Sequence, residues 1–363
     1  MKLLLVTREY PPYVKGGMSR VVVQMVRKSK QHGISLTIIA NHPRLKRTFN
    51  TVNGITLYRV PWLGSTFLTQ LPSFGYYASR LVNALQDDHD VIYSNFSPLY
   101  GKIKRPFIVG FHATRYGEAQ ACEEMKRPIH ALLNRLYIPF DRILIKKADG
   151  IVALTEKMAG EIRTIGDYGK EIEIIPGGVD TGIFRPLKYR DFSSPEKRVL
   201  FVGRLDSRKG VDILIHAIKL LRGNVKARLV VAGDGKEKEQ LRKLADSLSI
   251  PVDFLGAVPH ESLPEIYNSA DLFVLSSLYE GHPLVALEAM ACGTPTIVSD
   301  ASPDIGIPRF ERGSVVGLHQ VLFKTLSSEE ALSRLSETSL AISKNYSWDN
   351  VIDQTFTFIR KFS

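Results

Sequence analysis

The sequence alternates short apolar runs with longer segments whose apolar residues recur at helical spacing, and it does so in two successive blocks. Runs such as KLLLVT and FIVGF are too continuously apolar for half-exposed strands and are typical of buried parallel ones. Strands separated by helices on this scale predict an α/β fold with two doubly wound parallel sheets. The strands are expected at residues 2–7, 35–40, 55–60, 90–94, 107–111 and 150–154, and then at 199–202, 227–232, 252–255 and 271–276.

The length of 363 residues also favours two domains, because single hydrophobic cores rarely grow this large. A Pro-Gly-Gly turn and the polar stretch YRDFSSPEKR separate the two blocks and are typical of a linker. No run approaches the roughly 20 apolar residues that span a bilayer. The two cysteines, Cys122 and Cys292, lie far apart in the sequence, so a reducing cytoplasm is the expected location.

Positive charge is concentrated in the first part of the chain. Residues 1–150 contain 22 Lys and Arg against 9 Asp and Glu, a net charge of +13, whereas the whole chain carries +11. This asymmetry favours an anionic partner, such as a membrane surface or a phosphorylated substrate, although it also serves solubility. No zinc-finger or RNA-recognition motif supports binding to nucleic acid.

The stretch EGHPLVALEAMACGTP, residues 280–295, predicts a loop that leads into a helix. Pro283 suits the first helical turn, and Gly293 and Pro295 suit its end. Glu280 then precedes the helix and Glu288 lies about a turn and a half inside it. Both carboxylates can face a cleft at the carboxyl end of the preceding strand, where open α/β sheets bind ligands. Alternatively, both are solvated surface acids.

A second segment, VGRLDSRKG, lies between the first strand and the first helix of the second block. Arg204 and Lys209 are five residues apart in a loop that ends at a helix N-terminus. Two cations and a helix dipole at one place suit a diphosphate, although both can also be solvated loop residues. The segment is neither a Walker loop nor a G-x-G-x-x-G fingerprint.

Two features of the first block are candidates for ligand binding. Gly16 and Gly17 precede a helix and would let an anion approach its N-terminus, although such pairs are also common in turns. His112 directly follows the strand at 107–111 and can bind a ligand hydroxyl or serve a structural role. The basic segment 126–147 is expected to be a core helix with Leu132, Leu133 and Leu136 on one face; a lipid-contacting amphipathic surface is the alternative.

Taken in order, these segments resemble the family 4 glycosyltransferases, which are retaining enzymes with the GT-B fold of two Rossmann-like domains facing across a cleft. The resemblance covers nearly the whole chain, and the ordered combination is far more specific than any one motif. The segments that carry it are PPYVKGG, the post-strand His112, ADGIVALTEKM, IPGGVD with IFRP, VGRLDSRKG, VVAGDG, FLGAV, EGHPLVALEAMACGTP and YSWDNVIDQTFTFIRK.

The resemblance implies a domain organisation and a role for each candidate residue. It implies an acceptor-binding domain of residues 1–180 joined by a C-terminal helix at 347–363, a linker at 181–198, and a nucleotide-sugar-binding domain of residues 199–346. Glu280 faces the transferred sugar and Glu288 binds the ribose, while His112 contacts the sugar from the other domain. Arg204 and Lys209 hold the donor diphosphate opposite the glycine loop. The implied donor-binding residues are Gly16, Gly17, Glu288, Gly281, His282, Pro283, Leu284 and Val258. The implied catalytic residues are Arg204, Lys209, Glu280 and His112.

The implied reaction is transfer of a hexose from a UDP- or GDP-sugar to a glycan or lipid-linked acceptor, with retention of configuration. No cofactor or metal is expected, since two cations and helix N-termini can neutralise a diphosphate and no Asp-x-Asp motif is present. The basic first domain suggests peripheral contact of a cytoplasmic enzyme with the inner membrane face. After Asp300 the chain departs from the family pattern, because the usual glycine-rich loop ending in Glu is missing. A non-catalytic nucleotide-sugar-binding or scaffolding protein is therefore the alternative.

Overall fold

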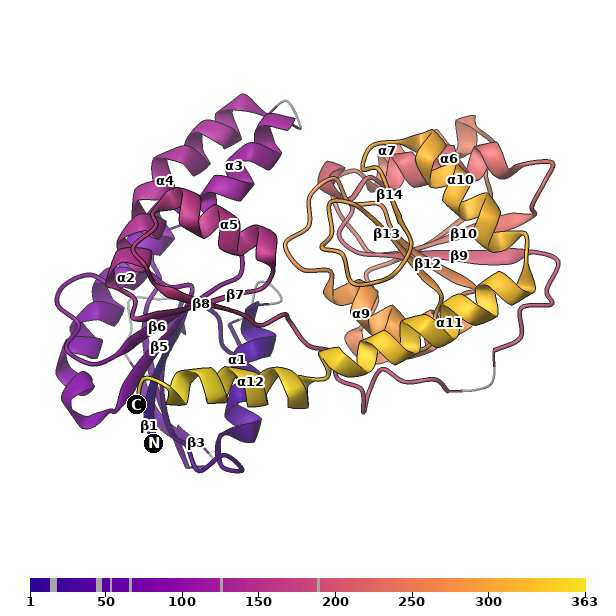
Figure 1. Cartoon of the computed structure of the whole chain (residues 1–363). Helices are drawn as coiled ribbons and strands as arrows, with labels where there is room; N and C mark the ends of the chain where they lie inside the picture. Colours follow the sequence, from indigo (N-terminus) through magenta and orange to yellow (C-terminus); the bar gives the residue numbers. More distant parts are fainter. Residues whose placement is uncertain (14–17, 44–47, 53, 65–66, 125–126, 188–189) are drawn as a thin grey trace. The chain divides into compact units, whose positions relative to one another are not determined.

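The computed structural model describes residues 1–13, 18–43, 48–52, 54–64, 67–124, 127–187 and 190–363. The chain divides into two compact units, Met1–Gly177 with Asp349–Ser363, and Gly178–Trp348 (Figure 1). The stretch expected to be a linker, 181–198, belongs to the second unit. Its Phe184 and Phe192 are buried in the hydrophobic core of that unit, so these two side chains anchor an otherwise largely exposed stretch to the second unit.

The first unit is built on a sheet in which the described residues form eight strands, in the order β3-β4-β2-β1-β5-β6-β7-β8. The apolar strand runs are buried as expected, since both faces of the sheet carry helices. Two strands, β3 and β8, were not predicted; β3 pairs antiparallel with β4 at the edge, so this sheet is not wholly parallel. The strands are β1 Lys2–Thr7, β2 Ser35–His42, β3 Thr48–Val52, β4 Ile55–Pro61, β5 Val91–Asn95, β6 Phe107–Phe111, β7 Gly150–Ala153 and β8 Glu171–Ile174.

Helices cover both faces of this sheet. α2, α4 and α5 share one hydrophobic cluster with the strands, while α1 and α12 are joined by ion pairs from Lys28 to Asp349 and from His32 to Asp353. The C-terminal helix α12 thus belongs to the first unit except for its first residue, Trp348. The helices are α1 Met18–Ser29, α2 Phe67–Leu85, α3 Arg115–Glu124, α4 Pro128–Lys147, α5 Glu156–Ile165 and α12 Trp348–Arg360.

The leucines of α4 correct an expectation. Leu132, Leu133 and Leu136 share one helix face as predicted, but that face is exposed and is not part of the core. The residues that α4 buries lie on its other side; they are Ala131, Tyr137, Asp141, Leu144 and Ile145. Helical spacing identified which leucines lie together but not which face of the helix is covered.

The second unit contains a smaller sheet in the order β11-β10-β9-β12-β13-β14, with all of its described pairs parallel. The chain reverses its direction of winding between β9 and β12, which makes their carboxyl ends the topological switch point of the sheet. The strands are β9 Lys197–Val202, β10 Ala227–Ala232, β11 Val252–Gly256, β12 Leu272–Leu275, β13 Thr296–Ser299 and β14 Arg309–Phe310.

Two helical layers enclose this second sheet, with α6, α7 and α10 on one face and α9 and α11 on the other (Figure 1). Side-chain caps define some helix starts; the hydroxyl of Ser328, for example, accepts from Ala331 N at 3.1 Å. Pro283, which was expected in the first helical turn, is the N-cap residue that directly precedes α9. The helices are α6 Val211–Leu221, α7 Lys238–Ser247, α8 Leu263–Ser269, α9 Leu284–Ala291, α10 Val315–Leu326 and α11 Glu329–Ser343.

Candidate active site

Two loops leave the second sheet side by side at its switch point. β9 and β12 are hydrogen-bonded parallel neighbours, with Val199 in register with Leu272. The loop after β9 carries Arg204 and Lys209, and the loop after β12 carries Glu280. Because parallel strands end at the same edge, the topology alone brings these three residues together. This is the position at which the sequence predicted a ligand site.

Close backbone contacts hold the two loops together. Gly210 has φ 58°, and a Cβ there would lie 2.3 Å from the carbonyl oxygen of Ser276, so only glycine fits. The hydroxyl of Ser276 donates to Lys209 O at 2.9 Å, and Leu278 N donates to Arg208 O at 2.7 Å. The base of the site is therefore set by the backbone, and the charged side chains extend from a fixed frame.

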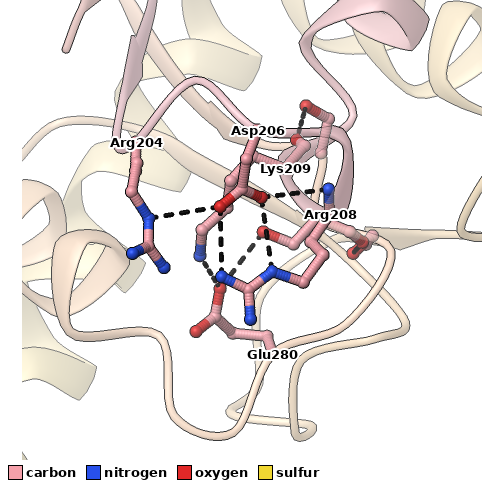
Figure 2. A network of polar contacts seen from close by, with 8 residues as sticks. Arg204, Asp206, Arg208, Lys209 and Glu280 are labelled. Carbon is pink, nitrogen blue, oxygen red and sulfur yellow. Dashed lines mark hydrogen bonds and ion pairs between the residues drawn. The ribbon is translucent and has the colours of Figure 1, made fainter. Parts of the chain in front are cut away.

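Lys209 and Glu280 form the central ion pair of the site. Lys209 Nζ lies 2.6 Å from Glu280 Oε2, which also accepts a hydrogen bond from the hydroxyl of Ser277 at 3.1 Å (Figure 2). Only 19% of the lysine side chain and 14% of the glutamate side chain are exposed. Partial burial strengthens the attraction relative to a surface pair. The carboxylate of Glu280 is thus held in one orientation beside a cation, which excludes the solvated-acid alternative.

Asp206 links the two arginines of the same loop. Its carboxylate lies 3.2 Å from Arg204 Nε and 3.1 Å from a terminal nitrogen of Arg208, which also donates through its backbone N–H (Figure 2). Burial alone would raise the pKa of Asp206, but the hydrogen bonds and charge of Arg208, with the charge of Arg204, lower it below the ordinary value. Asp206 stays ionised and anchors Arg204, whose side chain is 67% exposed.

Glu288 lies in the interior of the second unit, on α9. Its side chain is 2% exposed, so the alternative of an exposed helix residue is wrong. One oxygen accepts from the hydroxyl of Tyr267 at 3.0 Å, and the other lies 3.6 Å from Nε2 of His260. The two glutamates thus have different environments, with Glu280 in the cationic loop and Glu288 beside an aromatic residue and an imidazole.

The other predicted donor-binding residues of this unit lie on the same elements. Gly281, His282 and Leu284 are half-buried around the start of α9, and Pro283 is buried. The ring of His282 lies 6.4 Å from that of Tyr346. Val258 follows β11 and packs against the core. Among the described residues, no group of three or more His, Cys, Asp and Glu side chains is placed to hold a metal ion.

His112 belongs to a separate polar network in the first unit. Its Nε2 lies 2.6 Å from Asn95 Oδ1, and Asn95 Nδ2 donates to Thr7 Oγ1 at 3.3 Å. Because the amide nitrogen faces Thr7, the amide oxygen accepts from Nε2–H, which leaves the lone pair of neutral His112 on Nδ1. The network joins the carboxyl ends of three adjacent strands, β1, β5 and β6. The predicted Gly16 and Gly17 lie outside the described residues.

Sequence reasoning missed several residues of both networks. Asp206 stands inside the motif VGRLDSRKG, and a carboxylate between two arginines was the available signal. Asn95 directly follows the strand predicted at 90–94 and could have been paired with His112, which directly follows the strand predicted at 107–111. No signal in the sequence pointed to Tyr267, which lies 21 residues before its partner Glu288 on a different helix.

Two family models match most of the chain between them. The model described as "Glycosyltransferase Family 4" matches residues 15–182, and the model described as "Glycosyl transferases group 1" matches residues 188–319. A curated relative, the uncharacterized glycosyltransferase MJ1607 of Methanocaldococcus jannaschii, is 26% identical over 98% of this chain and 97% of its own length.

Solved structures share the fold over the whole length. Sucrose-phosphate synthase of Thermosynechococcus elongatus superposes with a TM-score of 0.76 at 18% identity, covering 99% of this chain and 98% of its own. HepE of Anabaena, solved in complex with UDP and glucose, gives a TM-score of 0.71 at 16% identity, covering 99% of this chain and 100% of its own. These are GT-B structures, so the fold class expected from the sequence is confirmed.

Proposed function

This chain belongs to the family 4 glycosyltransferases, and we propose that it transfers a hexose from a UDP- or GDP-sugar to a glycan or lipid-linked acceptor with retention of configuration. The observation that carries the proposal is the Lys209–Glu280 pair at the switch point of the second sheet, with Arg204 anchored beside it by Asp206. Cations and a carboxylate at one sheet edge match the two parts of such a donor, a diphosphate and a polyhydroxy sugar.

The donor is proposed to lie across the two loops of the second unit. Arg204 and Lys209 contact the diphosphate, the first through its planar fork and the second as a point charge. Glu280 accepts hydrogen bonds from the sugar hydroxyls, and buried Glu288 accepts them from the ribose. Backbone groups at His282 and near Val258 complete the nucleotide contacts. HepE, which shares the fold, was solved with UDP and glucose, and this supports the same class of donor here.

The reaction separates charge, and the proposed roles follow from that. As the glycosidic bond to the β-phosphate breaks, negative charge grows on the leaving oxygen and positive charge on the anomeric carbon. Arg204 and Lys209 stabilise the negative charge on the leaving oxygen without a metal ion. Each such preorganised group contributes about 100-fold or more to the rate. The leaving phosphate accepts the acceptor's proton on the same face, which retains configuration. No side-chain nucleophile is assigned.

The transferred sugar is proposed to contact His112 of the first unit. Held in place by the hydrogen bond between its Nε2 and Asn95 Oδ1, the imidazole is proposed to contact a sugar hydroxyl. Gly16 and Gly17 are proposed to approach the diphosphate through backbone N–H groups. The first unit also binds the acceptor in this proposal, and the net charge of +13 over residues 1–150 favours an acceptor that is anionic or embedded in an anionic membrane.

Contact with a membrane is proposed to be peripheral. No helix within the described ranges is long and apolar enough to cross a bilayer. The basic first part of the chain would instead be attracted to anionic lipid headgroups, an interaction that weakens as salt is added.

Incubation with radiolabelled UDP- and GDP-hexoses tests the proposed function. Slow hydrolysis of one donor, even without an acceptor, is the expected result. The alternative function, a non-catalytic nucleotide-sugar-binding protein, is motivated by the departure from the family pattern after Asp300 and predicts tight binding without turnover. A thermal shift with each nucleotide sugar identifies the bound donor in either case, since a ligand of the folded state raises its stability.

A further inference from the structure

A stripe of aliphatic side chains runs along the exposed side of α4. We call the five residues Ile129, Leu132, Leu133, Leu136 and Ile143 the α4 stripe; their exposed fractions are 71%, 59%, 37%, 62% and 42%. At 3.6 residues per turn all five fall within a sector of about 100°. All residues of α4 are described, and its buried residues occupy the other side of the helix. Isolated exposed leucines are ordinary, but a continuous aliphatic stripe on one helix indicates an interaction surface.

Basic residues border the α4 stripe along one flank. Arg135, Arg142 and Lys146 are exposed and, by helical geometry, lie together along one edge of the stripe, where Arg135 is paired with Glu123 of α3 at 2.6 Å. The helix has one acidic residue, Asp141, which is 3% exposed and accepts from the backbone N–H of Arg115. The accessible side of α4 therefore combines aliphatic groups with positive charge and carries no carboxylate of its own.

This combination fits a lipid surface better than a protein partner. Protein interfaces rely on aromatic and arginine anchors in well-packed pockets, whereas the α4 stripe is a convex row of leucine and isoleucine. Helices that lie in the plane of a bilayer interface insert an aliphatic face and hold Lys and Arg at the headgroups. The net charge of +13 over residues 1–150 adds long-range attraction to an anionic surface.

We infer that the α4 stripe is the surface by which this protein docks on anionic bilayers, with Ile129, Leu132, Leu133, Leu136 and Ile143 inserted among the acyl-chain ends. This inference rests on the membrane contact of the proposed function and locates it on one helix. Arg142 and Lys146 contact lipid phosphates, so that charge brings the protein to the surface and the stripe retains it.

Flotation with phosphatidylglycerol–phosphatidylcholine vesicles tests the inference in the full chain. The test variant is Leu132→Gln with Leu136→Gln; both side chains are more than half exposed, so the substitutions leave the core intact. The control is Leu220→Gln with Val316→Gln, which removes exposed aliphatic groups from α6 and α10 of the second unit. The wild type and the control are expected to float at low salt, and the test variant to partition at least about tenfold more weakly.

Each other result overturns the inference. Equal flotation of the test variant and the wild type would show that charge alone binds the bilayer, and equal binding to pure phosphatidylcholine would remove the need for an anionic surface. If the wild type does not bind vesicles but forms a dimer that the test variant cannot form, the α4 stripe binds a second copy of the chain. Donor hydrolysis, measured in solution on the same preparations, separates failure of the proposed reaction from failure of this inference.

Discussion

Nζ of Lys209 and Oε2 of Glu280 lie 2.6 Å apart, although the two residues are 71 positions apart in the sequence. The loops that carry them follow neighbouring parallel strands, and Gly210 permits the close approach of the first loop to Ser276 at the base of the second. The pair shows that the lysine and the glutamate proposed to be catalytic lie in one site. A donor diphosphate would have to share the lysine with this carboxylate.

Glu280→Gln is expected to separate nucleotide binding from turnover. The amide keeps the size of the side chain but removes a negative charge near the proposed diphosphate, so nucleoside diphosphate affinity should equal or exceed that of the wild type. Donor hydrolysis should fall by about 100-fold or more, because the charged group facing the sugar is lost. Calorimetric titration and a hydrolysis assay measure the two effects. Glu265→Gln, on the exposed side of α8, is the matched control.

Two results would contradict this role. Unchanged hydrolysis in Glu280→Gln would remove Glu280 from the chemistry. Loss of nucleotide binding together with hydrolysis would show instead that the carboxylate holds Lys209 in place and does little more.

Asn95→Ala tests the network behind His112. Without the amide oxygen that accepts from Nε2–H, the imidazole loses its preferred tautomer and orientation, so kcat should fall by about tenfold with little change in the KM for donor. Nitrogen-15 NMR of the His112 ring reports the tautomer independently of activity. Asn83→Ala, at an exposed position on α2, is the control. A KM effect with no change in kcat or in tautomer would assign Asn95 a structural role alone.

Most of the strands were predictable from sequence because buried parallel strands read as continuous apolar runs, of which KLLLVT and FIVGF are examples. The strand β3, TFNTV, was missed because it lies at the sheet edge and its composition is largely polar. The α4 leucines were placed on the right face but assigned to the core, since periodicity does not reveal what covers a face. In both cases the residue pattern does not reveal the tertiary environment. That environment decides whether a polar segment pairs at a sheet edge and whether an apolar helix face is covered.

The candidate site likewise contains some residues that sequence motifs predict and others that only the tertiary contacts reveal. Arg204, Lys209 and Glu280 were predictable because motifs place them after strands that end at one sheet edge. Asp206, Ser277 and Tyr267 act through side-chain contacts with those motif residues or with Glu288, and such contacts depend on rotamers and loop paths that spacing does not encode. Glu288 was identified as a site residue, but only the structure shows that it is buried.

Asp206 should stabilise the second unit in its ionised form. Its pKa in the folded chain is lowered from the ordinary value of 3.8, so its contribution is fully present above that value and is lost as pH falls through the folded pKa. The difference in thermal midpoint between the wild type and Asp206→Asn should therefore be constant from pH 7 to about 5 and shrink below about 4. A difference that does not change with pH would show that the charge of Asp206 is immaterial.

Asp141 should behave in the opposite way. Burial raises its pKa to about 7 from the ordinary value of 3.8, despite the backbone hydrogen bond and charge of Arg115. The neutral form therefore stabilises the first unit below about pH 4, and this contribution is lost as pH rises through about 7. Thermal midpoints should show the wild type losing stability relative to Asp141→Asn between pH 5 and 8. A wild type that gains stability relative to the variant over this range would contradict the assignment.

The most direct test of the proposed reaction is to measure donor hydrolysis across a panel of radiolabelled UDP- and GDP-hexoses. The wild type is compared with the double variant Arg204→Ala, Lys209→Ala. The control, Lys243→Ala, removes an exposed cation from α7 of the same unit. We expect hydrolysis of one donor by the wild type and the control, and a loss of at least about 100-fold in a double variant whose circular dichroism is unchanged. Full activity in the double variant, or tight donor binding by the wild type with no turnover on any donor, would contradict the proposal.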